Sequence, residues 1–373
     1  MKRLNLKSVL VFSVFILAMI SCRKETVKQE SPVQNEDAAL QAGAQKAIND
    51  KKETAASFLK EFEALDQSGT LKTGTSKTIV DIAIKYPFFS TLVAAVVKTD
   101  LAGVLSDPSL NATVFAPTDK AFAKLPPPFN SAKNINAITN PNDIAALKSV
   151  LLYHVLGNEV KARDIKKGRS SAETLKPKGS SNDNTIYLSK DFGLIFINGG
   201  SLVLVADVDA SNGVIHVVDD VLVFPTKNIA HIAVDGGFST LVAALVKTDL
   251  VNVFTGEGDF TVFAPTNAAF GKLPAPFNSA ENISNIHDPA QISALSNILR
   301  YHVTSSRSFT WDLGFFNRIP TLADGPKNKV IGILGADAGA VKGNNNRSFS
   351  VINPANILAT NGVVHVINQV LLP

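Results

Sequence analysis

Four sequence blocks occur twice in this chain, in the same order, and this duplication constrains the architecture more than any other feature. "FSTLVAAVVKTDL" at Phe89 returns as "FSTLVAALVKTDL" at Phe238, and "TVFAPTDKAF" at 113–122 returns as "TVFAPTNAAF" at 261–270. Two shorter pairs, "YHV" and "NGV", keep nearly the same spacing, and they begin at Tyr153 and Tyr301 and at Asn212 and Asn361. The two copies are about 149 residues apart, whereas solenoid repeats are only about 20 to 50 residues long. This distance indicates two copies of one domain, at 78–225 and 226–373.

Each copy changes from helical to strand-like patterning along its length. Phe89, Leu92, Val93 and Val96 follow the spacing i, i+3, i+4, i+7, so we expect a helix capped by Ser90. "ATVFAP" predicts a buried strand that ends at a proline, and a second helix is expected from 143, with position 154 on its inner face. Further strands are expected in the segments 185–189, 194–199, 201–208 and 213–224. Helices that precede most of the strands favour an α+β fold with a mixed or largely antiparallel sheet.

The phrase "TVFAPT" is followed by a residue pair suited to helix capping. The pair is Thr118 and Asp119 in the first copy, and Thr266 and Asn267 in the second. Asparagine keeps the capping oxygen of aspartate but loses its charge, an exchange that a nucleophile or a metal site would not readily tolerate. We therefore interpret the phrase as a structural corner between a strand and a helix.

The last shared block begins with an Asn-Gly pair, Asn212-Gly213 in the first copy and Asn361-Gly362 in the second. Both residue types accept positive φ, so each pair predicts a tight turn between strands.

Each copy also carries two histidines within the shared blocks. They are His154 and His216 in the first copy, and His302 and His365 in the second. Two histidines could begin a metal site, and Asp219 and Asp220 could add ligands to the first. The second copy has Asn368 and Gln369 instead, so a duplicated metal site would be broken there. We assign His216 and His365 to the fold, and expect no metal and no cofactor.

The N-terminus has the pattern of a secretory signal at 1–21. Lys2, Arg3 and Lys7 precede the apolar run "SVLVFSVFILAMI", which is short for a retained membrane anchor. The run ends beside Cys22, the only cysteine, and "AMISC" is similar to the lipobox of bacterial lipoproteins, although Met19 stands where Leu is usual. We expect acylation of Cys22 and anchoring without a membrane span; a cleavage site beside an unrelated cysteine is the alternative.

Residues 22–77 separate this signal from the first copy of the domain. The segment after Cys22 is polar and without an apolar period, which is typical of a flexible tether. Asp50 is placed like the N-cap of a helix, and the apolar residues Phe58, Leu59, Phe62 and Leu65 follow at helical spacing. They predict one short amphipathic helix. The copies themselves are joined near "FPTKN" at 224–228, a connection short enough to limit their relative freedom.

The charge of the chain argues against a nucleic-acid partner. Removing the three cationic residues of the signal lowers the net charge from +4 to +1. A nearly neutral surface lacks the many Lys and Arg contacts that phosphate binding requires.

Taken together, "TVFAPTDKAF", "YHV" and "NGVIHVVDDVL" resemble the fasciclin (FAS1) domain in order and spacing. The resemblance covers roughly 78–224 and 227–373, which is nearly all of the chain beyond the tether. It implies a compact α+β fold with a β-sandwich-like wedge of strands and a cluster of helices. It also implies an extracellular or membrane-tethered adhesion module, which bacteria often carry on lipoproteins.

Two groups of residues are candidate binding residues. The first comprises the pairs Tyr153-His154 and Tyr301-His302, because the corresponding segment of animal fasciclin proteins is linked to integrin binding; the alternative is that each imidazole is held by buried backbone groups. The second lies in the divergent segment 305–320, where an aromatic cluster could form a local core or contact a carbohydrate or a protein. Its candidate residues are Trp311, Phe315 and Phe316.

These features predict a non-catalytic, lipid-anchored protein of the bacterial cell envelope that binds an extracellular or envelope protein or polysaccharide. The outer membrane is favoured, with the protein facing the periplasm or the cell surface. One alternative is an accessory component of an envelope complex, for example one that handles glycans. Another is an envelope hydrolase or metal-dependent enzyme that uses Tyr153, His154, Asp219 and Asp220.

Overall fold

The structure is a computed structural model that describes residues 32–66, 76–179, 183–325, 328–334 and 339–373. The predicted signal, Cys22 and the first part of the predicted tether lie outside these residues.

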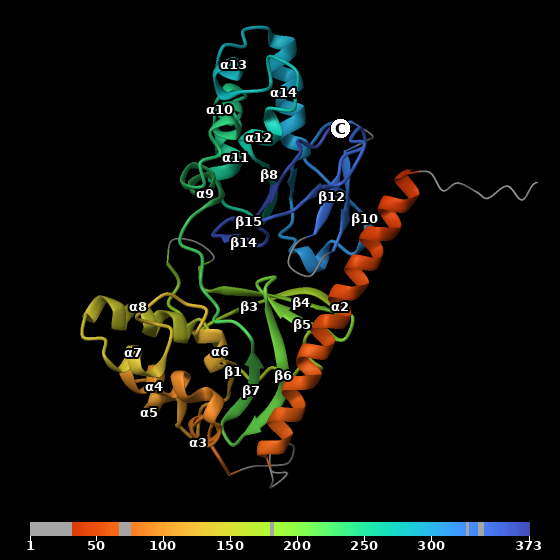
Figure 1. Cartoon of the computed structure of the whole chain (residues 1–373). Coiled ribbons are helices and arrows are strands. Elements are labelled where there is room, and N and C mark those ends of the chain that lie inside the picture. Colours follow the sequence, from red (N-terminus) through yellow and green to blue (C-terminus); the bar gives the residue numbers. More distant parts are fainter. Residues whose placement is uncertain (1–31, 67–75, 180–182, 326–327, 335–338) are drawn as a thin grey trace, which may run out of the picture. The chain divides into compact units, whose positions relative to one another are not determined.

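The first domain contains short helices and a single mixed sheet (Figure 1). Its helices are α3 (Ile79–Lys85), η2 (Pro87–Phe89), α4 (Ser90–Lys98), α5 (Ala102–Leu105), α6 (Asp119–Phe122), α7 (Ala132–Asn136) and α8 (Pro141–Leu152). Its strands are β1 (Ala112–Pro117), β2 (Val155–Leu156), β3 (Gly168–Glu173), β4 (Thr185–Asp191), β5 (Leu194–Ile197), β6 (Ser201–Ala210) and β7 (Gly213–Val218). They form a seven-stranded sheet in the order β2-β1-β7-β6-β5-β4-β3, in which only β1 and β7 pair in parallel.

The second domain repeats this plan with its strands divided between two four-stranded sheets. Its helices are α9 (Ile229–Asp235), α10 (Ser239–Lys247), α11 (Val251–Thr255), α12 (Asn267–Phe270), α13 (Ala280–Ser284), α14 (Pro289–Tyr301) and η3 (Thr310–Asp312). Its strands are β8 (Phe260–Pro265), β9 (Val303–Thr304), β10 (Phe315–Pro320), β11 (Lys329–Ile333), β12 (Ala340–Lys342), β13 (Ser350–Val351), β14 (Ile357–Ala359) and β15 (Gly362–Ile367). The sheet orders are β10-β11-β12-β13 and β14-β15-β8-β9, and β8 and β15 again pair in parallel.

The segment before the first domain differs from the sequence prediction. Helix α2 runs from Pro32 to Leu65 without interruption, so Asp50 lies inside a helix and does not cap a short one. From Leu40 onward this helix buries Ala44, Ala47 and Ile48, as well as the predicted Phe58 and Phe62. Small and apolar residues at helical spacing, in a stretch rich in strong helix formers, thus support a helix where a tether was predicted.

Two smaller expectations also need correction. Ser90 is the first residue of α4 and does not cap it, because Phe89 occupies the N-cap position. Helix α8 begins at Pro141 with Asn140 as its cap, slightly before the predicted start at 143. In addition, strand β3, which alternates half-buried and exposed residues, lies before the first of the expected strands and was not predicted.

The predicted turns are present, and the glycines in them are needed for close packing. Gly213 has φ +147°, and a Cβ atom there would lie 2.0 Å from the carbonyl oxygen of Ala112 on the parallel strand β1. A Cβ at Gly362 would meet the carbonyl oxygen of Phe260 at 2.3 Å. Only glycine therefore lets β7 and β15 begin beside their parallel partners.

Within the described residues, no single helix is long and apolar enough to cross a membrane. The bent pair Ile79–Lys85 and Pro87–Lys98, with an angle of 113°, has sufficient length and apolar composition. Both helices belong to the first domain.

Candidate functional site in the shared motifs and at the domain interface

The corner after "TVFAP" joins two helices in each domain. Thr118 caps α6 by accepting a hydrogen bond from the Ala121 N–H. The Asp119 carboxylate reaches across to α4, where it accepts from the Thr91 N–H at 2.7 Å and from the Ser90 hydroxyl at 2.8 Å. Because α4 has no cap from its own N-cap residue, a residue from another helix supplies it.

The second domain keeps this arrangement without the charge. Thr266 caps α12 through the Ala269 N–H, and the Asn267 side-chain oxygen accepts from the Thr240 N–H of α10 at 3.0 Å. The amide nitrogen of Asn267 adds a bond to the Gly237 carbonyl. In each domain one side-chain oxygen at this position accepts a hydrogen bond from the first turn of α4 or α10, as a structural corner requires.

The asparagine of the last block connects three segments of its domain. Its side-chain oxygen accepts a hydrogen bond from the first N–H of a helix. Asn212 accepts from the Ile79 N–H and Asn361 from the Ile229 N–H, both at 2.9 Å. Its amide nitrogen donates to two carbonyls at the C-terminal end of a short helix. They are those of Leu105 and Asp107 for Asn212, and of Phe254 and Gly256 for Asn361. Both asparagines are buried, so the turn also organises the helices.

The Tyr-His pairs are buried, and their polar atoms are bonded within the domain. Tyr153 donates its hydroxyl hydrogen to the Thr185 carbonyl at 2.7 Å and accepts from the Asn198 amide. His154 Nε2 accepts from the Leu222 N–H at 2.8 Å, so the ring proton is on Nδ1, which lies 2.7 Å from the Val150 carbonyl and donates to it. Both nitrogens of this imidazole are therefore engaged by the backbone.

The second pair has the same geometry. Tyr301 donates to the Lys329 carbonyl at 2.7 Å and accepts from the Asn344 N–H. His302 accepts from the Leu371 N–H at Nε2 and faces the Ile298 carbonyl with Nδ1, both at 2.8 Å. In both domains the pair links the end of α8 or α14 to the segment that follows the last strand.

The remaining shared histidines use the opposite tautomer. His216 Nδ1 accepts from the Asp207 N–H, so Nε2 carries the proton and donates to the Val160 carbonyl at 2.9 Å. His365 repeats this with the Asn356 N–H and the Ser308 carbonyl. Each imidazole also stacks on a neighbouring phenylalanine, Phe115 or Phe263.

Burial keeps these imidazoles neutral. It lowers the pKa of His154, His302 and His365 from 6.5 to about 4, against an opposing effect of the carbonyl that each ring faces. Burial also lowers the pKa of His216. A neutral ring with both nitrogens bonded to the backbone has no lone pair free for a metal and no proton to exchange with a substrate.

The acidic pair of the first domain does not join these histidines. Asp219 accepts from the Leu202 N–H at 2.6 Å, and burial raises its pKa. Asp220 forms an ion pair with Lys124 at 2.6 Å. Over the part of the chain that the structure describes, there is no group of three or more His, Cys, Asp or Glu residues that could hold a metal ion.

The aromatic segment 305–320 packs against the first domain. The Trp311 indole stacks on Phe196 of β5, with 4.1 Å between ring centroids and 10° between ring planes, and only 4% of its surface is exposed. Phe315 meets Phe192 edge to face at 5.8 Å. Phe316 instead contacts Phe349 of its own domain. The segment thus forms a protein contact, but its partner is the other domain of the same chain.

Two arginines contribute polar contacts to this interface, and the Asn356 amide adds a hydrogen bond to the Gly199 carbonyl of the first domain at 2.8 Å. Arg169 of β3 donates through Nη1 to the Arg307 carbonyl at 2.8 Å and to the Ser308 hydroxyl at 2.7 Å. The Arg307 guanidinium lies over the Tyr187 ring at 4.2 Å and forms an ion pair with Asp259. Neither arginine was singled out from the sequence, because an isolated Arg in a divergent segment shows no pattern.

One apolar cluster extends through the interface and includes α2. It contains core residues of the first domain, residues of α2 beyond Leu40, and a patch from the second domain. The patch comprises Trp311, Ile333, Leu334, Ala340 and Phe349. Shared burial of these residues joins the two domains and α2 from Leu40 onward into one packed unit.

A family model decides the identity of the two repeated domains. The model of the fasciclin domain matches residues 87–224 and 236–373. The chain belongs to the fasciclin family. Fasciclin domains are typically adhesion modules, which supports a binding role for this chain and not a catalytic one.

Relatives of the chain come from animals and bacteria. It is 31% identical over 263 residues to transforming growth factor-beta-induced protein ig-h3 from Sus scrofa, a match that covers 70% of this chain and 34% of that protein. It is 36% identical over 168 residues to protein sll1483 from Synechocystis, covering 44% of this chain and 85% of the relative. The chain thus spans about a third of the length of ig-h3.

A solved structure of a FAS1 domain pair from the insect cell adhesion molecule fasciclin I is also similar to this chain. The TM-score is 0.36 and the sequence identity is 17%, over 77% of this chain and 96% of that one.

The fasciclin fold places the predicted Tyr-His binding residues out of reach of a partner. Tyr153 and Tyr301 have no exposed surface, and His154 and His302 are 2% exposed. A macromolecule could contact them only after local unfolding. Their position supports the alternative interpretation, in which buried backbone groups hold each imidazole.

Proposed function

We propose that this fasciclin protein is a lipid-anchored, non-catalytic binding protein of the bacterial cell envelope. Cys22 would carry the acyl chains, and the packed domain pair would bind an extracellular or envelope protein or polysaccharide. The outer membrane is the favoured location, with the pair facing the periplasm or the cell surface.

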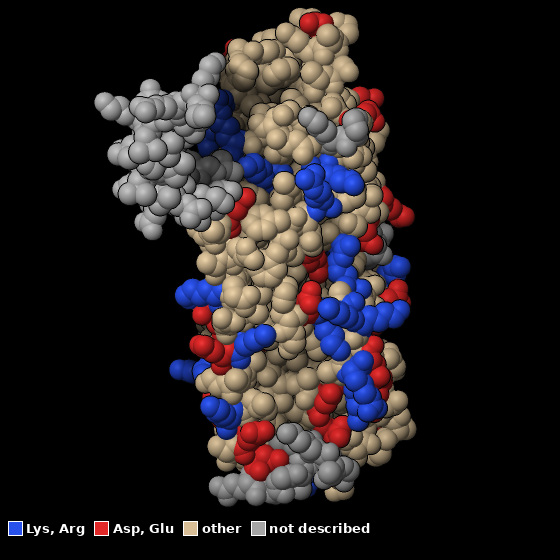
Figure 2. Space-filling model, turned by 90° about the vertical axis from the view of Figure 1, so that its right-hand side faces the viewer, with Lys and Arg blue, Asp and Glu red and all other residues tan. Residues whose placement is uncertain are grey.

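The use of the shared motif residues is the observation that carries this proposal. The side chains of Asp119, Asn212, His154 and His216, and of their counterparts in the second domain, are bonded to backbone groups of their own domain. The motif residues that the two domains share therefore stabilise the fold. Contacts to a partner would be made by residues of the exposed surface. Figure 2 shows acidic and basic side chains interspersed on one such face.

The domain interface supports a binding role in a second way. Two adhesion domains held by Trp311, Phe196 and the flanking arginines present their surfaces at a fixed separation. Fixed geometry raises avidity only for ligands whose sites repeat at a matching distance. A repetitive polysaccharide or a protein array in the envelope satisfies this condition.

Membrane attachment is tested by fractionating cells that express the full chain or Cys22→Ser. We expect the native chain in the membrane fraction and Cys22→Ser in the soluble fraction, since one acylated cysteine is the proposed anchor. Membrane recovery of both forms would refute acylation at this position.

Binding is tested by protease treatment of intact cells and by arrays of envelope polysaccharides and matrix proteins. An adhesin for other cells must be cleaved on intact cells, whereas a periplasmic binding protein must be protected. Binding to no array component, together with stable copurification in a membrane complex, would replace this proposal with an accessory role in that complex.

A further inference from the structure

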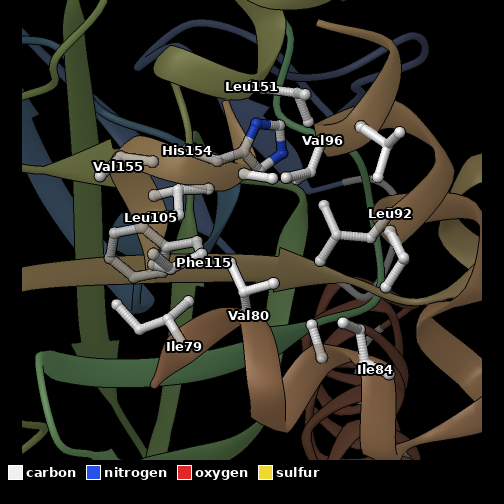
Figure 3. A pocket seen from close by; sticks show the side chains of 15 residues that line it. Ile79, Val80, Ile84, Leu92, Val96, Leu105, Phe115, Leu151, His154 and Val155 are labelled. Carbon is white, nitrogen blue, oxygen red and sulfur yellow. The ribbon is translucent and has the colours of Figure 1, made fainter. Parts of the chain in front are cut away.

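The first domain contains an apolar pocket that the binding role described above does not use. The pocket has a volume of about 130 Å³ and lies between α3, α4, α5, β1 and α8 (Figure 3). Its floor is buried and includes Ile79, Leu92, Val96, Leu105 and Leu151. His154 also borders it, but both ring nitrogens are bonded to the backbone, so the pocket offers a ligand almost no polar group.

The mouth of the pocket is marked by apolar side chains that face solvent. Ile84 of α3 and Val97 of α4 line the pocket and are each 64% exposed. Val104 of α5 is 53% exposed and lies next to the lining residue Leu105 in the sequence, but it does not line the pocket itself. Single exposed valines are common on proteins, but here two exposed apolar residues open onto a buried apolar space.

The size and chemistry of the pocket define what can occupy it. An apolar cavity of about 150 Å³ stays free of water and takes up benzene, because water finds no hydrogen-bond partners there. The volume holds no more than a group of this size, and a polar group would find almost no hydrogen-bond partner among the lining side chains. We propose that this pocket is a binding site for a small apolar ligand group, of about the size of a benzene ring.

The two domains differ at two positions that line the pocket of the first domain. At the positions of Val96 and Leu105, the second domain has the larger residues Leu245 and Phe254, both buried. The fold therefore accepts larger side chains at these two positions, although the second domain still contains a pocket that Phe254 lines. The first domain keeps the smaller residues and the space they leave.

The second domain has its own pocket, of about 220 Å³, lined by residues of α11 and α14. It includes Phe254, Leu299 and Val303, which occupy the positions of Leu105, Leu151 and Val155 in the first pocket, and it extends toward Leu250, Leu322 and the charged Arg300. A test of the first pocket must therefore resolve the two sites by residue.

The experiment is a benzene titration of the full chain beyond the signal, followed by methyl NMR of its Ile, Leu and Val residues. We expect saturable shifts at the methyl groups of Ile79, Val96, Leu105 and Leu151. The variants Val96→Leu and Leu105→Phe import the residues of the second domain, and each should weaken binding at these methyl groups at least about tenfold. Val351→Leu makes the same chemical change at an exposed site and should leave the titration unchanged.

Thermal unfolding of the same variants separates loss of the site from loss of the fold. Both filling variants should unfold at or above the temperature of the native chain, because they add buried apolar volume to an existing space. If Leu105→Phe does not fold, Val96→Leu decides the question alone. Absence of benzene shifts at these methyl groups, or equal affinity in the native chain and a folded filling variant, would overturn the proposal.

Discussion

Acid pH should destabilise the second domain through its two buried histidines. The pKa of His302 and His365 is about 4 in the folded chain, against an ordinary value of 6.5, and burial is the main cause. Because the folded pKa is lowered, the neutral rings contribute their full stability to the domain above pH 6.5. The free energy of unfolding falls as the pH drops from 6.5 to about 4, because in this range only the unfolded chain takes up the protons.

The magnitude follows from these values. Each pH unit below 6.5 costs about 1.4 kcal/mol per histidine as long as the folded ring stays neutral. At pH 5 the loss is about 2 kcal/mol for each ring, or about 4 kcal/mol for the domain if the two rings act independently. Such a loss is a large part of the stability of an ordinary domain, which is about 5 to 15 kcal/mol.

The assay is urea unfolding at pH 7, 6 and 5, followed by the fluorescence of Trp311, the only tryptophan in the chain. Burial raises the pKa of Asp312, so this carboxyl takes up its proton at a higher pH in the folded chain than in the unfolded chain, which opposes the effect of the histidines. The informative comparison is therefore between the native chain and His302→Gln. Glutamine can still accept from the Leu371 N–H, but it does not titrate.

His302→Gln should be less stable than the native chain at pH 7, and this difference should shrink by about 2 kcal/mol at pH 5. His287→Gln alters an exposed histidine of the same domain and should keep the native pH dependence. A constant difference between His302→Gln and the native chain from pH 7 to pH 5 would refute the assignment of a neutral, buried imidazole.

Two further predictions concern the shared corner and the interface. Asp119→Ala should lower the free energy of unfolding by about 1–2 kcal/mol, because the Thr91 N–H loses its cap. Asp119→Asn should lower it by less than half as much. Chemical denaturation measures both losses, and equal losses would contradict the capping role. Trp311→Ala should lower the free energy of unfolding by about 3–5 kcal/mol and divide a single thermal transition into two, which calorimetry would detect. Val351→Ala, at an exposed site, serves as the control. One unchanged transition in Trp311→Ala would show that the stack does not couple the domains.

The repeated blocks were sufficient to predict the fold and the structural role of the corner. The exchange of Asp119 for Asn267 kept one acceptor atom and changed the charge, and the structure shows that atom bonded to the backbone of α4 or α10 in both domains. Local periodicity likewise placed His154 on a buried face. Patterns of this kind depend on neighbouring residues, so a single sequence contains them.

Contacts between distant segments could not be predicted in this way. The aromatic residues near Trp311 indicated a contact, but Phe196 has no property that marks it as the partner. The first half of helix α2 was missed because its buried residues are mostly alanines, such as Ala44 and Ala47, which contribute little to an apolar pattern. Its strong helix formers were the signal that could have identified it.

The stack of Trp311 on Phe196 joins unlike surfaces of two related domains, and this limits further assembly. A contact between different surfaces can in principle continue from copy to copy and produce an open filament. Here the segment of the first domain that corresponds to 305–320, at 157–172, contains no aromatic residue, and strand β12 of the second domain has Ala340 and Val341 where β5 supplies Phe196. Each half of the contact exists in only one domain, so a chain that uses both halves internally presents neither of them for a contact of this kind with another copy.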